Sequence, residues 1–168
     1  DLMIDCTGGM YSLINYIRNE FTEIYDILNK NIILTNYNIK FSGVFYRDPV
    51  DSINDIHEYQ PLGDVNDLLE RMKTIHSYGG ADLPEDWVGA YEIALDKNRI
   101  GWRKNSVKII IHITDAGAHG GGTEILRQKL WLSAVFVMAV AVVSAAMRYG
   151  FRVFNARASE TLVKTMRD

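Results

Sequence analysis

Apolar runs typical of buried strands alternate along this chain with segments whose apolar residues recur at helical spacing. The strand-like runs are Leu2–Ile4, Phe41–Tyr46, Ile56–Gln60 and Val107–Ile113, and the amphipathic segments are Met10–Leu28 and Val65–Ile75. Alternation of this kind favours parallel strands joined by right-handed crossovers. We therefore predict an α/β fold, with a doubly wound and mostly parallel sheet between two layers of helices.

The rest of the chain adds further expected elements. Residues 82–95 should form a helix that opens at Asp82-Leu83-Pro84-Glu85, with proline in its tolerated first turn. Leu130–Met147 is apolar on all sides and about 27 Å long as a helix. We interpret it as a buried helix, with a membrane segment or a partner surface as alternatives. A strand is expected at Phe151–Phe154, and a last helix from Ser159.

Composition restricts the class of protein and of partner. A chain of 168 residues with 48% hydrophobic content is expected to form one domain over residues 1–168. The net charge is −3 and lysine and arginine are scattered, which argues against nucleic acid or an anionic membrane as partner. Cys6 is the single cysteine, which slightly favours a reducing, cytoplasmic setting. The sequence opens inside a strand, as if cut from a longer chain.

Two aspartates follow strand-like runs. Asp5 ends the first run and Asp115 ends the run at Val107–Ile113, and glycine comes soon after each. In parallel sheets ligands bind beyond the carboxyl ends of the strands, so both carboxylates should meet at one edge. Clustered acids repel unless a cation lies among them, and hard oxygen ligands suit Mg²⁺ or Ca²⁺. The sequence therefore predicts a divalent cation site.

Several motifs in the first part of the chain occur in an order found in one family. They are Asp5-Cys6-Thr7-Gly8-Gly9-Met10, Tyr46-Arg47-Asp48, Gly79-Gly80-Ala81-Asp82-Leu83-Pro84-Glu85-Asp86, Trp102-Arg103, and His112-Ile113-Thr114-Asp115-Ala116 with His119-Gly120. The first resembles the Asp-x-Ser/Thr-x-Ser loop of the metal-ion-dependent adhesion site in von Willebrand factor A domains. The ordered set resembles the A domains linked to alpha-kinases in protists, and it covers residues 1–120.

The resemblance implies a ligand set for one Mg²⁺, Mn²⁺ or Ca²⁺ ion. Asp5 and Thr7 would be first-loop ligands, and Asp115 the third-loop acid. Gly9 stands where the family has its second serine, so one hydroxyl ligand is lost. Ala81 occupies the position of the second-loop threonine, and Asp82 beside it would be the substitute. Three carboxylates would overcompensate a divalent cation, so an acidic partner residue should be attracted less strongly than at an adhesion-type site.

Structural roles remain open for several of these residues. Asp82 with Glu85 could be a helix N-cap and capping box, Thr7 could cap the first helix, and Asp115 could cap a glycine-rich turn. Gly120-Gly121-Gly122 lacks the spacing of a phosphate loop. His112, inside an apolar strand, is interpreted as a hydrogen-bonded core residue. Trp87 and Tyr91 share a helical face and are expected in the core.

The leading functional hypothesis is a non-catalytic, metal-dependent domain that binds a protein ligand at the metal edge of the sheet, within a larger signalling protein. The resemblance suggests a kinase elsewhere in that protein. The alternative is a phosphoryl-transfer enzyme with an aspartate nucleophile, because Asp5-Cys6-Thr7-Gly8-Gly9 also resembles the Asp-Lys-Thr-Gly-Thr loop of haloacid-dehalogenase-like ATPases. Asp115 has no second acid behind it, which disfavours that enzyme.

Overall fold

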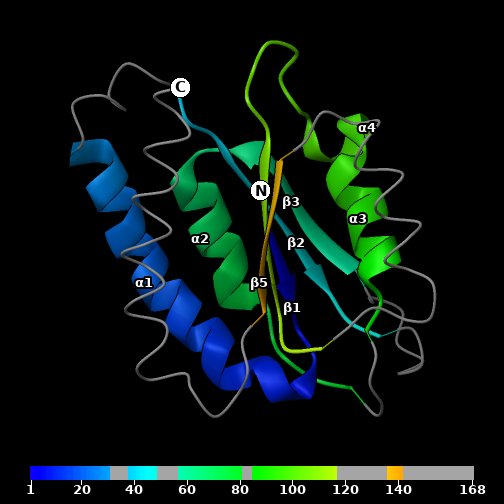
Figure 1. Ribbon diagram of the computed structural model, residues 1–168. Coiled ribbons are helices and arrows are strands. Elements are labelled where there is room, and N and C mark those ends of the chain that lie inside the picture. The colour runs from blue at the N-terminus through cyan, green and yellow to red at the C-terminus, as the bar shows by residue number, and fades with distance from the viewer. Residues whose placement is uncertain (31–37, 49–56, 81–84, 117–135, 142–168) are drawn as a thin grey trace.

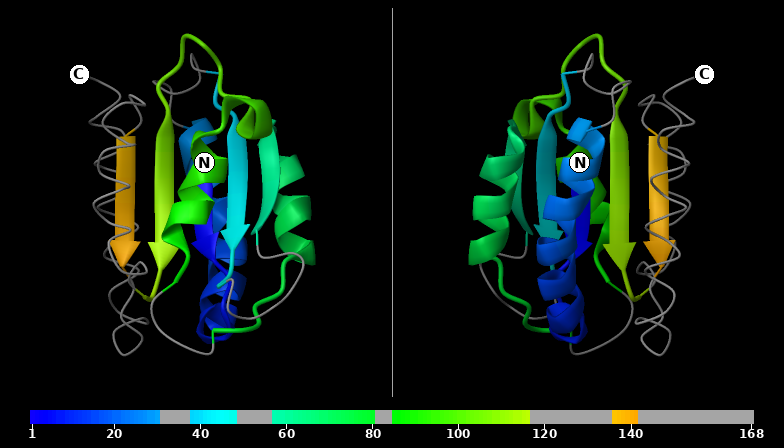
Figure 2. Two further views of the ribbon diagram at one scale, coloured as in Figure 1. Left: turned by 90° about the vertical axis from the view of Figure 1, so that its right-hand side faces the viewer. Right: turned by 90° about the vertical axis from the view of Figure 1, so that its left-hand side faces the viewer.

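A five-stranded sheet forms the centre of the computed structural model, which describes residues 1–30, 38–48, 57–80, 85–116 and 136–141. The strands are β1 (Leu2–Asp5), β2 (Phe41–Tyr46), β3 (His57–Gly63), β4 (Ile109–Thr114) and β5 (Phe136–Ala141). Their order is β3-β2-β1-β4-β5, with β5 at one edge (Figure 2). β3 pairs antiparallel with β2, and every other pair is parallel. The sheet is therefore mostly parallel, as predicted.

Helices cover both faces of this sheet (Figure 1). One layer contains α1 (Tyr11–Lys30), which follows the short 3₁₀ helix η1 (Gly8–Met10), and α2 (Val65–Thr74). The other layer contains α3 (Trp87–Leu95) and α4 (Lys97–Ile100). The three-layer α/β prediction is confirmed.

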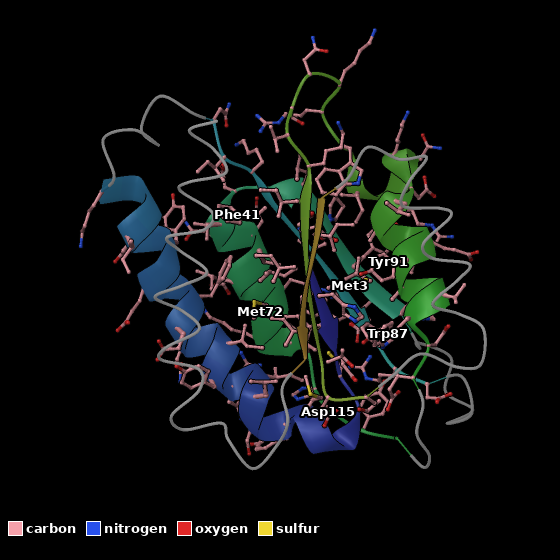
Figure 3. The ribbon with its side chains drawn as sticks, viewed as in Figure 1. Met3, Phe41, Met72, Trp87, Tyr91 and Asp115 are labelled. Carbon is pink, nitrogen blue, oxygen red and sulfur yellow. The ribbon has the colours of Figure 1, made fainter. Side chains whose placement is uncertain are left out.

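The core has two halves because successive strand residues point to opposite faces. Leu2 and Ile4 of β1 pack with buried residues of α1 and α2, such as Leu68. Met3, between them, packs on the other face with buried residues of α3, such as Tyr91. Figure 3 shows Met3 and Tyr91 on the side of the sheet opposite to Met72 of α2. With both faces covered, β1 is buried throughout, which explains its continuous apolar sequence.

The predicted apolar helix at Leu130–Met147 is wrong where the structure describes it. Residues 136–141 form β5, which pairs in parallel with β4 from Ile109↔Phe136 to Thr114↔Ala141. A strand in a parallel sheet reads as a continuous apolar run, and periodicity cannot distinguish it from a buried helix. The rest of that segment, with Phe151–Phe154 and Ser159, lies outside the described residues. No helix in the described part of the chain is long and apolar enough to span a bilayer.

The helix expected from Asp82 begins later. α3 starts at Trp87, and its N-cap is Asp86, whose Oδ1 accepts a hydrogen bond from the backbone N–H of Gly89 at 3.0 Å. Glu85 forms an isolated β-bridge before the helix. The capping box proposed for Asp82 and Glu85 is therefore wrong, because the helix is capped by the next acid along the chain. Asp82 itself lies outside the described residues.

Candidate metal centre

The loops that follow β1 and β4 meet at the carboxyl edge of the sheet, because these strands are parallel neighbours. Ile4 lies opposite Ile113, so Asp5 and Thr114 come next to each other at the two strand ends. Asp115 follows directly and is labelled at this edge in Figure 3. The predicted meeting of the two strand-end loops is thus observed.

Asp5 is fully buried, and its carboxylate is held by three hydrogen bonds. Its Oδ1 accepts from the backbone N–H of Thr7 at 2.9 Å and from Oγ1 of Thr7 at 2.8 Å. Its Oδ2 accepts from Oγ1 of Thr114 at 3.1 Å. Burial raises the pKa of Asp5; the bonds from Thr7 oppose that shift, and the charge of Asp115 adds to it. The carboxylate is therefore fixed in orientation but costly to keep ionised.

The first loop is shaped by backbone bonds as well. Thr7 is the N-cap of η1 through its backbone, but its side chain makes no capping hydrogen bond. Its hydroxyl is directed to Asp5 instead, so a purely helix-capping role for Thr7 is not observed. The backbone N–H of Gly8 donates to the carbonyl of Gly79 at 3.0 Å, and Tyr78 N–H donates to the carbonyl of Cys6 at 3.1 Å.

The Gly79-Gly80 pair brings the second loop close to the first. Both glycines have positive φ, 79° and 83°, which L side chains rarely adopt. A Cβ atom on Gly80 would lie 3.0 Å from Cβ of Thr7. Glycine is thus required here for conformation and for close approach. Through these two glycines, the backbone that follows α2 passes beside Thr7.

Two further acids that sequence reasoning did not assign to the site lie in this region. Glu85 and Asp48 are both buried. Burial first, and then the charges of Asp5, Asp48 and Asp115, raise the pKa of Glu85 to about 8. The buried Oε2 of Glu85 has no hydrogen-bond partner within the described residues. The sequence signals that could have identified Asp48 and Glu85 are the motifs in which they occur, Tyr46-Arg47-Asp48 and Pro84-Glu85.

These residues offer the donors that a hard divalent cation prefers. Asp5 and Asp115 offer carboxylate oxygens and Thr7 a hydroxyl, and Glu85, whose Oε2 is unpartnered among the described residues, is close enough to be influenced by the charges of Asp5 and Asp115. No three Asp, Glu, His or Cys side chains among residues 1–30, 38–48, 57–80, 85–116 and 136–141 are placed to hold a metal ion by themselves. The predicted set contains three acids, and its third, Asp82, lies outside those ranges. The donor chemistry fits a metal.

The rim of this edge is exposed to solvent. Asp115 is exposed, and so are Gly8 and Gly9 in the first loop and Gly79 and Gly80 in the second. Buried oxygen donors thus lie at the base of an edge whose rim is exposed.

The sequence also predicted core positions for His112, Trp87 and Tyr91. His112 is buried and hydrogen-bonded to Tyr46, and Tyr91 is buried in the same core half with Trp87 packed against it. Their predicted core roles are confirmed. His119 and Gly120-Gly121-Gly122 lie outside the described residues.

The chain is similar in sequence to part of a curated protein kinase. It is 30% identical over 119 residues to alpha-protein kinase vwkA from Dictyostelium discoideum. The match covers 70% of this chain but 18% of the kinase, so the chain spans less than a fifth of that relative. No protein-family model matches the chain.

Solved structures with a similar fold include the SpRpn10 VWA domain, with a TM-score of 0.57 and 11% identity over 86% of this chain and 75% of that one. Proximal thread matrix protein 1 from the mussel byssus has a TM-score of 0.50 and 18% identity over 83% of this chain and 34% of its own. At these identities the similarity establishes the fold. The chain is therefore a von Willebrand factor A-like domain, similar in sequence to part of an alpha-protein kinase.

Proposed function

We propose that this domain binds one divalent cation, Mg²⁺ or alternatively Mn²⁺ or Ca²⁺, and uses it to bind a protein partner. Asp5, Thr7 and Asp115 are the ligands within the described residues, and Asp82 of the second loop is the fourth. The observation that carries the proposal is the grouping of acids at the carboxyl edge of the sheet: burial and then the charge of Asp115 raise the pKa of Asp5, and burial and then the charges of Asp5, Asp48 and Asp115 raise the pKa of Glu85. Such repulsion is relieved when a cation lies between the carboxylates.

The partner contacts the exposed rim of this edge and supplies an oxygen to the cation. Partner binding is supported by the von Willebrand factor A fold, which is generally a non-catalytic interaction module. The domain is proposed to belong to a larger signalling protein, because its similar segment in the Dictyostelium relative is 18% of an alpha-protein kinase. Any catalysis would then lie outside this segment. A cytoplasmic setting fits the buried thiol of Cys6.

Titration calorimetry with MnCl₂ tests the cation site directly. The unsubstituted chain should bind one Mn²⁺ ion, and Mg²⁺ should compete for it. Asp5→Ala and Asp115→Ala should each remove the binding heat. The control is Asp26→Ala, which removes an exposed carboxylate of α1 and should leave binding unchanged. Equal binding by Asp5→Ala and the unsubstituted chain would overturn the proposal.

Asp82→Ala tests the ligand that lies outside the described residues. The N-cap of α3 is Asp86, so loss of an α3 cap cannot explain an effect of this substitution. A coordinating Asp82 predicts weaker Mn²⁺ binding with a similar unfolding temperature in EDTA. Unchanged Mn²⁺ affinity would remove Asp82 from the ligand set.

The phosphoryl-transfer alternative gains no support from the similarities found. A generic phosphate ester, p-nitrophenyl phosphate, with Mg²⁺ discriminates between the two functions. We expect no turnover. Hydrolysis that needs Mg²⁺ and disappears in Asp5→Asn would establish the enzyme in place of the binding module.

A further inference from the structure

The residues on either side of Thr7 are both hydrogen-bonded to the backbone that follows α2. The N–H of Tyr78 donates to the carbonyl of Cys6 at 3.1 Å, and the N–H of Gly8 donates to the carbonyl of Gly79 at 3.0 Å. Thr7 lies between these two bonds, and its own side chain is hydrogen-bonded to the buried carboxylate at the end of β1. The backbone of this proposed ligand is therefore held from outside the first loop.

Residues 75–80, here called the 75–80 segment, supply these bonds but belong to no helix or strand. Without a helix or a sheet ladder of its own, such a segment depends on neighbouring elements to keep one position. Arg18 of α1 reaches its first residue, with Nη2 3.4 Å from the carbonyl of Ile75. The part of the segment nearest to the first loop needs a separate contact.

Arg47 provides that contact. It directly follows β2 and is 2% exposed, so its guanidinium lies inside the protein. Its Nη2 donates to the carbonyl of His76, and its Cζ lies over the ring of Tyr78, 4.1 Å from the ring centroid. Tyr78 is the residue whose N–H donates to Cys6. One side chain thus holds two residues of the 75–80 segment, including one that bonds to the first loop.

A carboxylate of β3 compensates the buried charge of Arg47 and orients it. Nη1 of Arg47 donates to Oε1 of Glu58 at 3.0 Å, and Nη2 of Arg71 on α2 donates to Oε2 at 2.8 Å. Arginine stays protonated in proteins, and its hydrogen bonds to carboxylates are stronger than neutral ones. Glu58 therefore anchors one side of the Arg47 guanidinium to the sheet, while Nη2 is directed at the 75–80 segment.

We propose that Arg47 is a positioning residue of the cation site: its guanidinium, anchored on Glu58, holds the 75–80 segment against the first loop and so fixes Thr7. This inference rests on the proposed function. Outer contacts that orient metal ligands commonly contribute about 10- to 100-fold to metal affinity. Arginine suits this role because its planar fork donates in two directions and also stacks on a ring, which the single ammonium of lysine cannot do.

A matched pair of substitutions on the two arginines tests this role. Arg47→Lys and Arg71→Lys each keep the positive charge and each replace one of the two guanidinium groups on Glu58. Of the two, Arg47 is the one whose described bonds reach the 75–80 segment. In the full 168-residue chain, calorimetry should show Mn²⁺ affinity lowered by about tenfold or more in Arg47→Lys. Arg71→Lys should bind Mn²⁺ like the unsubstituted chain, even where its unfolding temperature falls.

A second pair, at Tyr78, leaves Arg47 in place and keeps the proposal testable if Arg47→Lys folds poorly. Tyr78→Phe keeps an aromatic face for the guanidinium and should keep the Mn²⁺ affinity. Tyr78→Leu removes that face and should weaken Mn²⁺ binding several-fold. Both variants retain the backbone N–H that donates to Cys6, so the difference between them reports on the ring contact. Equal affinities for the two variants would contradict the proposed role.

Hydrogen exchange in EDTA reports on the 75–80 segment without any metal. The amides of Tyr78 and Gly8 should exchange faster in Arg47→Lys than in the unsubstituted chain, because their hydrogen bonds join the segment to the first loop. The amide of Ile111 is the control. It donates to the carbonyl of Asp1 at 2.9 Å, at the opposite end of β1, and its exchange should change less.

The possible failures are distinguishable. Mn²⁺ affinity of Arg47→Lys equal to that of the unsubstituted chain overturns the positioning role. Equal weakening by Arg47→Lys and Arg71→Lys, or equal acceleration of all three amides, also overturns it, because either result indicates general loosening of the domain. Absence of Mn²⁺ binding in the unsubstituted chain overturns the proposed function itself, whereas hydrogen exchange still shows whether Arg47 holds the 75–80 segment.

Discussion

Gly9 and Asp115 approach so closely that a Cβ atom on Gly9 would lie 3.1 Å from Oδ2 of Asp115. Gly9 occupies the position where the related motif has a serine hydroxyl. The absence of a side chain there leaves room for the Asp115 carboxylate beside the first loop. The lost hydroxyl and the nearness of this acid are therefore two aspects of one local arrangement.

This arrangement predicts that Gly9→Ala weakens cation binding several-fold. The added methyl group would push the exposed Asp115 carboxylate away from its place, since 3.1 Å is tighter than ordinary contact. The measurement is Mn²⁺ affinity by calorimetry. Mn²⁺ affinity of Gly9→Ala equal to that of the unsubstituted chain would contradict the explanation.

Glu85→Gln should stabilise the metal-free domain at neutral pH. The pKa of Glu85 is raised from 4.5 to about 8, so between these values the folded state binds more protons than the unfolded state. Stability contributed by protonated Glu85 is thus present at low pH and is lost as pH rises towards about 8. Unfolding temperatures in EDTA from pH 5 to 8 should fall less steeply for Glu85→Gln. Glu70→Gln, on the exposed surface of α2, should keep the original slope.

His112 should make the stability of the domain depend on pH in the opposite sense, with stability lost as pH falls. Its folded pKa of about 3 lies below the ordinary value of 6.5, so the unfolded state binds more protons between these values. The domain should lose stability as pH falls below 6.5, because the ring is neutral in the folded state and takes up a proton on unfolding. Denaturant titrations should show a shallower acid loss in His112→Asn, though a lower stability at pH 7. Substitution of the exposed His76 by Asn is the control.

The strands that carry the site could be predicted because burial on both faces of the sheet determines their apolar sequences. β1, β2 and β4 lie within a sheet covered on both faces, so their apolar runs were sufficient to place them. β5 was mistaken for a helix because the same burial erases any periodicity. Its composition could not correct the mistake, since helix-favouring alanine and methionine are as frequent there as strand-favouring valine and phenylalanine.

The site was predictable in its strand-end acids and not in its supporting groups. Asp5 and Asp115 are separated by 110 residues but are placed by a rule about strand ends. Tyr46 and Thr114 are the last residues of β2 and β4, and their places on either side of Asp5 depend on which strands are neighbours and in what register. Glu85 was assigned to a helix start, because proline followed by glutamate fits a first turn equally well.

The most direct test of the cation site is the unfolding temperature in Mg²⁺ and in EDTA. A cation that binds only the folded state at about a hundredfold excess over Kd stabilises it by about 2.7 kcal/mol, or about 5 to 10 °C for a domain of this size. Asp5→Ala should abolish the shift and slightly stabilise the metal-free domain, whereas Asp26→Ala should keep the shift. Superimposable melting curves in millimolar Mg²⁺ and in EDTA for the unsubstituted chain would contradict the metal site.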